Sequence, residues 1–400
     1  MAKPPRSSKK AGAVALLLAM VLLGVFPIDV LLPSFPALSH HFDTSGADIA
    51  LSISLFAIGI SLSQLLIGPL SDRLGRKNLL LAGMAVSLFG ALGCVASGDY
   101  RLFLLFRLVQ AIGCGCFVLS QALVQDLFSG KERERLRILI VTASGIFISI
   151  SPLLGSILQA WLDWPGSFYF FSALALLVLL KAWVSLENPS PSAATPHSMG
   201  ILQAYRQVCS SSAFFGYWLI AASAFACHFS FIVISPLLFM ERLHLDSYQF
   251  ALTLLLYGVA YVVGGVLAGI LNRRLEAGAQ IVIGLFLILC SGLSMAALTG
   301  VYGLSLATVM GPMLFCTAGV TIARPAATSR AMELFPDYAG TSASAGNTLV
   351  FVVGGAVSAL VNLYGERLQL TLAASLVLLA CLGLLLSQWV GRQQRDLNTA

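Results

Sequence analysis

The chain has 400 residues, of which 58% are hydrophobic and 10% are charged, and its formal net charge is +6. A soluble protein is typically about 25% charged, so this composition excludes a water-soluble globule. It predicts instead an all-α integral membrane protein, in which each spanning helix needs about 20 mainly apolar residues.

Twelve apolar runs, separated by polar or Gly/Pro-rich breaks, predict twelve transmembrane helices. The weakest break lies near Thr299 to Gly303. The predicted spans are 12–33, 47–70, 79–97, 101–125, 136–160, 166–186, 213–236, 248–271, 279–299, 302–323, 341–363 and 368–390.

The longest connection, residues 188–212, divides these spans into two sets of six. It is rich in Pro and Ser, which is typical of a flexible linker. At an offset of 200 residues, Asp72-Arg73 corresponds to Asn272-Arg273, so the halves resemble each other weakly. Transporters built from such repeats place the substrate site between them. The sequence therefore predicts two pseudo-symmetric six-helix bundles, 1–187 and 213–400, joined by a cytoplasmic linker.

The basic residues predict the orientation, because Lys and Arg accumulate on the cytoplasmic side of a membrane. If the N-terminus is cytoplasmic, only Arg101, Arg242 and Arg367 of the 23 basic residues lie outside, and Arg107 alone lies within a span. Arg324 belongs to the cytoplasmic set in this arrangement. Both termini are therefore predicted to be cytoplasmic, and the positive charge is explained by the lipid bilayer and not by nucleic acid.

Two ionisable residues inside the predicted spans are candidates for function, because inserting such a group costs roughly 2.5–3.5 kcal/mol. Asp29 lies toward the outer part of span one, and Arg107 lies in the outer-to-middle part of span four. If they form a pair, protonation of Asp29 releases Arg107, and this predicts a proton switch. The alternatives are a structural ion pair that fixes spans one and four, or an Asp29 shallow enough to be hydrated.

Several other residues inside the spans are candidates for movement or substrate contact. Pro152 and Gly155 in span five predict a bend and a close helix approach, either as a gating hinge or for packing alone. Polar and aromatic residues are candidates to line a substrate cavity, with helix-to-helix hydrogen bonding as the alternative for each. These residues are Gln64, Gln110, Gln121, His228, Tyr257, Tyr261 and Asn347.

Motifs of other protein classes are missing from the sequence. It contains no G-x-x-x-x-G-K-[ST] phosphate loop, no H-E-x-x-H and no G-x-S-x-G, which argues against an ATP-driven pump and against an enzyme. No metal-ligand spacing is present either. We therefore expect no metal and no cofactor, with an ion gradient or the gradient of the substrate itself as the energy source.

Residues 68–77, GPLSDRLGRK, resemble the signature G-x-x-x-D-R-x-G-R-[KR] of the major facilitator superfamily, and every fixed position is present. The resemblance implies the major facilitator fold and a charge network between Asp72, Arg73 and Arg76 and the end of span eleven, which stabilises the outward-open state. The residues implied in this conformational lock are Gly68, Asp72, Arg73, Gly75, Arg76 and Lys77.

Further segments resemble the drug:proton antiporter group of this superfamily. They are 29–36 (DVLLPSFP), 107–113 (RLVQAIG) with 125–127 (QDL), and 151–156 (SPLLGS); residues 335–344 (FPDYAGTSAS) resemble its Bcr/CflA-type branch. The resemblance implies a monomeric protein of the bacterial inner membrane that exports small organic compounds in exchange for protons, by alternating access between the two halves. Such a protein is a multidrug efflux transporter that contributes to antibiotic resistance.

Other functions remain as alternatives at this stage. On the same fold, the protein would export one metabolite, such as a siderophore or an amino acid derivative, or would import its substrate. A non-transporting membrane sensor or scaffold is an alternative of another class. Because spans seven to twelve contain no clear acid, proton coupling is predicted in the first half. A strongly cationic drug would find only one carboxylate to pair with, so neutral, zwitterionic or anionic substrates are favoured alongside lipophilic drugs.

Overall fold

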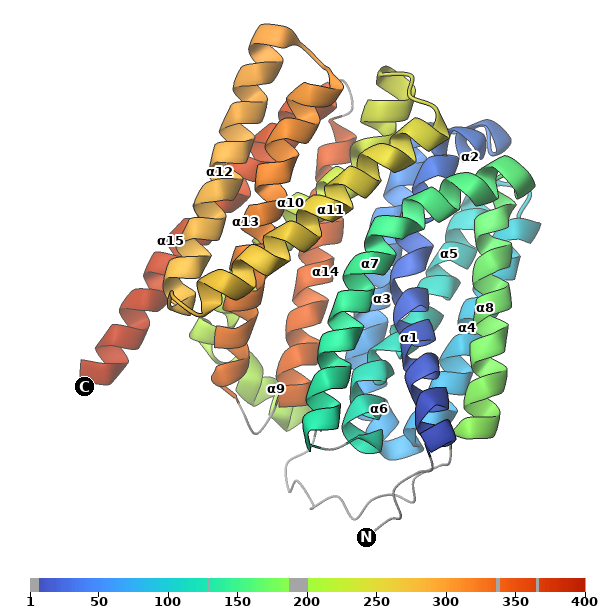
Figure 1. Ribbon diagram of the computed structural model, residues 1–400, viewed down its shortest axis with the longest axis horizontal. Helices are drawn as coiled ribbons and strands as arrows, with labels where there is room; N and C mark the ends of the chain where they lie inside the picture. The colour runs from blue at the N-terminus through green and yellow to red at the C-terminus, as the bar shows by residue number, and fades with distance from the viewer. Residues whose placement is uncertain (1–6, 129, 187–200, 336–338, 365–366, 400) are drawn as a thin grey trace.

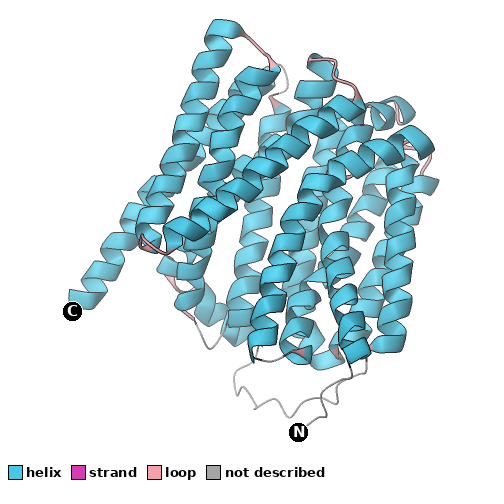
Figure 2. Ribbon diagram, viewed as in Figure 1, coloured by secondary structure: helices cyan, strands magenta, loops and turns pink. Residues whose placement is uncertain are grey.

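The computed structural model describes residues 7–128, 130–186, 201–335, 339–364 and 367–399, and all regular secondary structure within these ranges is helical (Figure 2). The helices form two groups side by side, α1 to α8 and α10 to α15 (Figure 1). Their bounds are α1 Ser7–Asp29, η1 Leu32–Ser34, α2 Phe35–His41, α3 Gly46–Leu74, α4 Arg76–Ala96, α5 Tyr100–Cys114, η2 Gly115–Val118, α6 Leu119–Leu127, α7 Gly130–Leu162, α8 Pro165–Ser185, α9 Ile201–Cys209, α10 Ser212–Pro236, η3 Leu237–Arg242, α11 Ser247–Asn272, α12 Ala277–Tyr302, α13 Leu306–Glu333, α14 Ala339–Leu363 and α15 Leu368–Thr399.

The predicted spans correspond to these helices. Eleven segments of the described chain are long and apolar enough to cross a membrane. The remaining predicted span lies in α7, whose apolar stretch is the shorter Ile146–Leu162 but which runs the height of the bundle beside the others (Figure 1). The chain is therefore a multi-pass α-helical membrane protein.

Among the boundaries that differ from the sequence prediction, those of α12 and α13 change the reading of the second half. Helix α12 continues through Thr299 to Tyr302, and the chain turns at Gly303, whose φ of 72° suits glycine. Helix α13 continues to Glu333, ten residues beyond the predicted end at 323. The Ala-rich segment after Pro325 is favourable for helix, so a single proline does not end α13.

Part of the predicted linker is helical. Residues Ile201–Cys209 form the short helix α9, which packs against α10 and α14. Residues 187–200 lie outside the described chain. The Pro/Ser composition therefore did not reveal a helix that contacts the second half.

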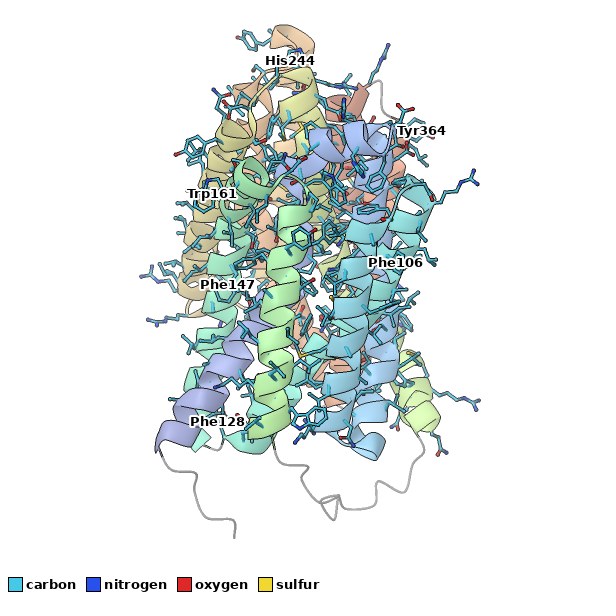
Figure 3. All side chains as sticks on the ribbon, turned by 90° about the vertical axis from the view of Figure 1, so that its right-hand side faces the viewer. Phe106, Phe128, Phe147, Trp161, His244 and Tyr364 are labelled. Atoms are coloured by element: carbon cyan, nitrogen blue, oxygen red, sulfur yellow. The ribbon has the colours of Figure 1, made fainter. Side chains whose placement is uncertain are left out.

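Side-chain caps fix where several helices begin. In α11, Asp246 accepts hydrogen bonds from the backbone N–H groups of Tyr248 and Gln249 at 2.9 and 2.8 Å, and the Gln249 side chain accepts from the Asp246 N–H. A second capping box joins Ser305 and Thr308 at the start of α13. Both boxes lie at the end of the bundle that carries His244, labelled at the top of Figure 3. We call this the His244 end and the opposite one the Gly75 end.

The two halves meet along two helix pairs, α3 with α14 and α7 with α11. Asn362 donates to the Ala47 carbonyl at 2.6 Å, and the hydroxyls of Ser54 and Ser358 are 2.7 Å apart. Nearer the Gly75 end, Thr348 donates to the Ser61 carbonyl at 3.1 Å. The small side chains of these residues allow close helix packing and bridge the halves along most of α3.

Candidate functional site

Asp29 is the last residue of α1 and lies within the first half. The α-helix ends here because Pro33 and Pro36 follow, and the chain continues as η1 and then α2. The Asp29 side chain is only 7% exposed. Within the described chain, no group forms a hydrogen bond or an ion pair with its carboxylate. An enclosed acid without a donor is costly to keep charged and is a candidate for function inside a membrane.

Arg107 lies on α5 and is buried, with an exposed fraction of 1%. Its Nη1 donates to Gln110 Oε1 at 2.7 Å, and its Nη2 donates to the Pro27 carbonyl at 3.2 Å. The guanidinium also lies over the Phe56 ring, 4.2 Å from the centroid. The Pro27 carbonyl is available because the helix breaks at Asp29, so that the Leu31 N–H bonds to Ile28 instead.

A cavity of about 10 Å³ adjoins Arg107, Gln110 and Pro27. This is close to the volume that one water molecule needs. The Nε of Arg107 has no hydrogen-bond partner among the described atoms. One water in this cavity would supply a partner for that polar group.

Asp29 and Arg107 do not form the ion pair that the sequence predicts for the switch. Arg107 contacts α1 two residues earlier, at the Pro27 carbonyl. In this conformation Arg107 therefore contacts the backbone at the end of α1 and not the Asp29 carboxylate. Their role in proton coupling stays a prediction.

Gly155 of α7 lies directly against this part of α1. A Cβ at Gly155 would overlap the carbonyl oxygen of Val30, and Ser167 of α8 donates to the same carbonyl at 3.4 Å. Pro152 lies inside α7 and is buried. The close helix approach expected for this segment is present, and its action as a hinge stays a prediction.

The predicted lock surrounds the turn between α3 and α4. Gly75 is the single residue between the two helices, with φ 86° and ψ 136°, and Arg76 begins α4. Lys77 Nζ donates to the Trp183 carbonyl of α8 at 2.7 Å, a contact within the first half. The side chains of Asp72 and Arg73, like Gly68, lie outside the part that the structure describes, so the lock to span eleven stays a prediction.

Gly75→Ala should lower stability, because φ 86° with ψ 136° is a conformation that only glycine adopts readily. Forcing a Cβ into such a conformation costs about 1–3 kcal/mol. A thermal unfolding scan of the purified protein should show a lower midpoint. Gly98→Ala is the matched control, because Gly98 is exposed and its Cβ would meet no atom within 4 Å; equal midpoints for both variants would contradict the prediction.

In the second half, three of the predicted cavity residues form one cluster. His228 Nδ1 and the Tyr257 hydroxyl are 2.7 Å apart, and their rings stack with centroids 5.5 Å apart. The Tyr261 ring also contacts the His228 ring, with their centroids 5.5 Å apart. His228 and Tyr257 are buried, whereas Tyr261 is partly exposed. The cluster joins α10 to α11.

Arg324 also belongs to this region, and it lies within a helix and not in the connection after residue 323, where the sequence prediction placed it. Because α13 continues to Glu333, Arg324 lies inside the helix, with its guanidinium 4.7 Å from the centroid of the Phe225 ring. It is close enough to His228 to act on it electrostatically. The helix-favouring residues after Pro325 were the signal that could have placed it within the span.

The remaining cavity candidates are spread over both halves. Gln64 in α3 and Asn347 in α14 are partly buried; Ser344, one turn from Asn347, donates to the Gln64 carbonyl at 3.4 Å. Gln110 is engaged with Arg107. The side chain of Gln121 lies outside the described set.

Helix α9 contacts both halves at the Gly75 end. The Tyr205 hydroxyl lies 3.1 Å from Ser344 Oγ in α14 and 3.4 Å from the Leu65 carbonyl in α3. Burial raises the pKa of Tyr205, so its hydroxyl keeps its proton and remains a donor. The contact of Tyr205 was not predicted from the sequence because helix α9 was not predicted.

Tyr205→Phe should loosen α9 from the two halves. One net hydrogen bond is worth about 0.5–1.5 kcal/mol, which corresponds to several-fold faster amide exchange over 201–209. Hydrogen-exchange mass spectrometry of the purified protein measures this rate. Tyr248→Phe, at an exposed position, is the control and should leave exchange in α9 unchanged. Unchanged exchange in Tyr205→Phe would show that the Tyr205 hydroxyl does not hold α9 against the two halves.

Two groups of helices that meet along paired helices, with charged groups enclosed within the bundle, are the arrangement of a membrane transporter. Residues 16–359 match the family model described as Major Facilitator Superfamily. The chain belongs to this family.

Known proteins similar to the chain agree with this assignment. A chloramphenicol resistance protein of Pseudomonas aeruginosa is 26% identical over 86% of this chain and 81% of its own length. The multidrug resistance protein MdtL of Citrobacter koseri is 27% identical over 82% of each chain. Among solved structures, a bacterial homologue of the human lysosomal transporter Spinster has a TM-score of 0.77 and 16% identity, with 96% of this chain and 98% of that chain covered. The last comparison concerns the fold alone.

Proposed function

We propose that the protein is a proton-coupled antiporter that exports small organic compounds across a bacterial inner membrane by alternating access, as a multidrug efflux transporter of the Bcr/CflA type. The observation that carries the proposal is the enclosed Asp29 carboxylate, which has no partner among the described residues. Such an acid in a membrane protein is typical of proton relays. The names of the chloramphenicol and multidrug resistance relatives support drugs as the cargo.

In the proposed cycle, Asp29 takes a proton from the side opposite the cytoplasm. Loss of its negative charge changes the field at the end of α1, where Arg107 holds the Pro27 carbonyl. Movement of α1 is then transmitted to α7, because Gly155 lies against the Val30 carbonyl. Substrate would bind between the halves, and the protein would act as a monomer with both termini cytoplasmic.

The test is dissipation of a pH gradient in everted membrane vesicles that contain the protein, followed with a pH-sensitive dye. Lipophilic drugs and small metabolites are added one at a time, and vesicles without the protein are the control. Responses to several chemically unrelated drugs would support multidrug antiport. A response to one metabolite alone would replace it by dedicated export, and silence across the panel would contradict proton-coupled export.

A further inference from the structure

Arg324 lies near the middle of the second half. Phe225, the ring beneath its guanidinium, is the fourteenth residue of α10, which begins at Ser212 and ends at Pro236. With a rise of 1.5 Å per residue, Phe225 is about 20 Å from one end of α10 and about 16 Å from the other. The Arg324 cation is therefore held at a depth where a charge is costly without a partner.

No carboxylate accompanies this cation in the described part of the chain. The acids of the second half whose side chains the structure describes lie near helix ends: Glu241, Asp246, Glu276 and Glu333. Of these, Glu333 is engaged with Arg330 at 3.5 Å. Arg324 has no hydrogen-bond acceptor among the described residues, whereas Arg107 has two. The donors of Arg324 are thus available to a ligand.

The side chains around Arg324 are mostly aromatic. Phe225 stacks on Phe229 with centroids 5.3 Å apart and meets the edge of Phe351 at 5.1 Å. His228 adds its ring stacked on Tyr257. Arg324 and Phe351 are both partly exposed, so a small molecule has access to the charge and to a ring. A guanidinium beside flat apolar surfaces suits a planar molecule that carries a carboxylate.

We propose that Arg324, at the junction of α10 and α13, binds the carboxylate of aromatic organic anions, whose rings pack on the Phe225 and Phe351 side. This inference rests on the proposed export function and names its substrate class. Away from the two ends of the bundle, the described spans contain Arg107, Arg324 and one acid, Asp29. Their charges favour an anionic or zwitterionic substrate over a cationic one.

The test is direct binding of two isosteric probes to the purified protein at low salt, measured by microscale thermophoresis. The probes are 2-naphthoate and its neutral amide, 2-naphthamide. Wild type should bind 2-naphthoate at least tenfold more tightly than the amide, because a charge-assisted bidentate bond adds to the ring contact. Arg324→Gln should remove this preference, and Arg324→Lys, which keeps the charge but not the planar donor pair, should retain part of it.

Arg330→Gln is the matched control, because it removes the same charge from the same helix at its Gly75 end, and it should keep the wild-type preference. Equal affinity of wild type for the two probes, or a 2-naphthoate affinity that Arg324→Gln leaves unchanged, would overturn the proposal. If the Gln variant does not fold, the Lys variant and the salt dependence of wild-type binding decide, because salt should weaken only 2-naphthoate. Binding needs no proton gradient, so failure of proton-coupled export leaves this result independent.

Discussion

Asp29→Asn should abolish the pH-gradient response to every transported compound while leaving the protein folded. The substitution keeps the shape of the side chain but removes the group that binds the proton. Since the carboxylate is 7% exposed and has no hydrogen-bond donor among the described residues, an uncharged amide costs no more to enclose than the acid. We expect at least about a tenfold loss of proton-coupled transport, as for removal of a group that transfers a proton, with an unchanged or higher thermal midpoint.

The matched control for this prediction is Asp43→Asn. Asp43 is exposed between α2 and α3 at the His244 end, and its φ of 46° is one that Asn also tolerates. The control should respond to drugs as wild type does. Counterflow of a labelled substrate between liposome compartments at equal pH should persist in Asp29→Asn, because it requires binding and movement but no net proton transfer. A wild-type pH response in Asp29→Asn would refute the proton switch.

The sequence predicted the spans because hydropathy and helix breakers act locally. Gly75 illustrates this: a glycine between two apolar runs predicts a tight connection, and the structure places it alone between α3 and α4 with positive φ. Asp29 was found for a similar reason, since an acid in an apolar run is visible without knowledge of its neighbours.

Partners across the fold were not predictable in the same way. Arg107 binds Gln110 and the Pro27 carbonyl, and the second acceptor exists only because α1 breaks next to α5. The predicted end of span ten fell before Arg324 because a proline follows it, whereas α13 continues to Glu333 and is stabilised by packing against α10, α11 and α12. Helix α9 was not predicted because part of its packing is against α14, which is far from it in sequence.

The missing ion pair has a physical cause. Opposite charges suggested an ion pair between Asp29 and Arg107, but a carbonyl released by a helix break is also a strong acceptor. A second cation in the C-terminal half shifts the balance of enclosed charge toward positive. The sequence favoured neutral, zwitterionic or anionic substrates only because few acids are available. Arg324 is the group that we propose binds such an anion.

Gly258→Leu should stop transport, because the two halves pack closely against each other at this glycine. A Cβ at Gly258 of α11 would overlap the Ser149 side chain and lie 2.8 Å from its Cα in α7. Protein interiors cannot absorb an added side chain against backbone without displacement, so α7 and α11 must separate. Since alternating access requires the halves to pack and unpack along this pair, we expect at least about a tenfold lower transport rate, with both bundles folded.

Gly265→Leu is the control on the same helix, because a Cβ there meets no atom within 4 Å, and it should transport as wild type does. Hydrogen exchange locates the effect: in Gly258→Leu, amides of α7 and α11 near the contact should exchange faster, whereas those of α3 and α14 should change less. If Gly258→Leu transports normally and exchange along α7 is unaltered, then the contact between α7 and α11 is not part of the transport cycle. If transport is lost together with the fold of either bundle, the glycine serves packing within the halves and the prediction fails.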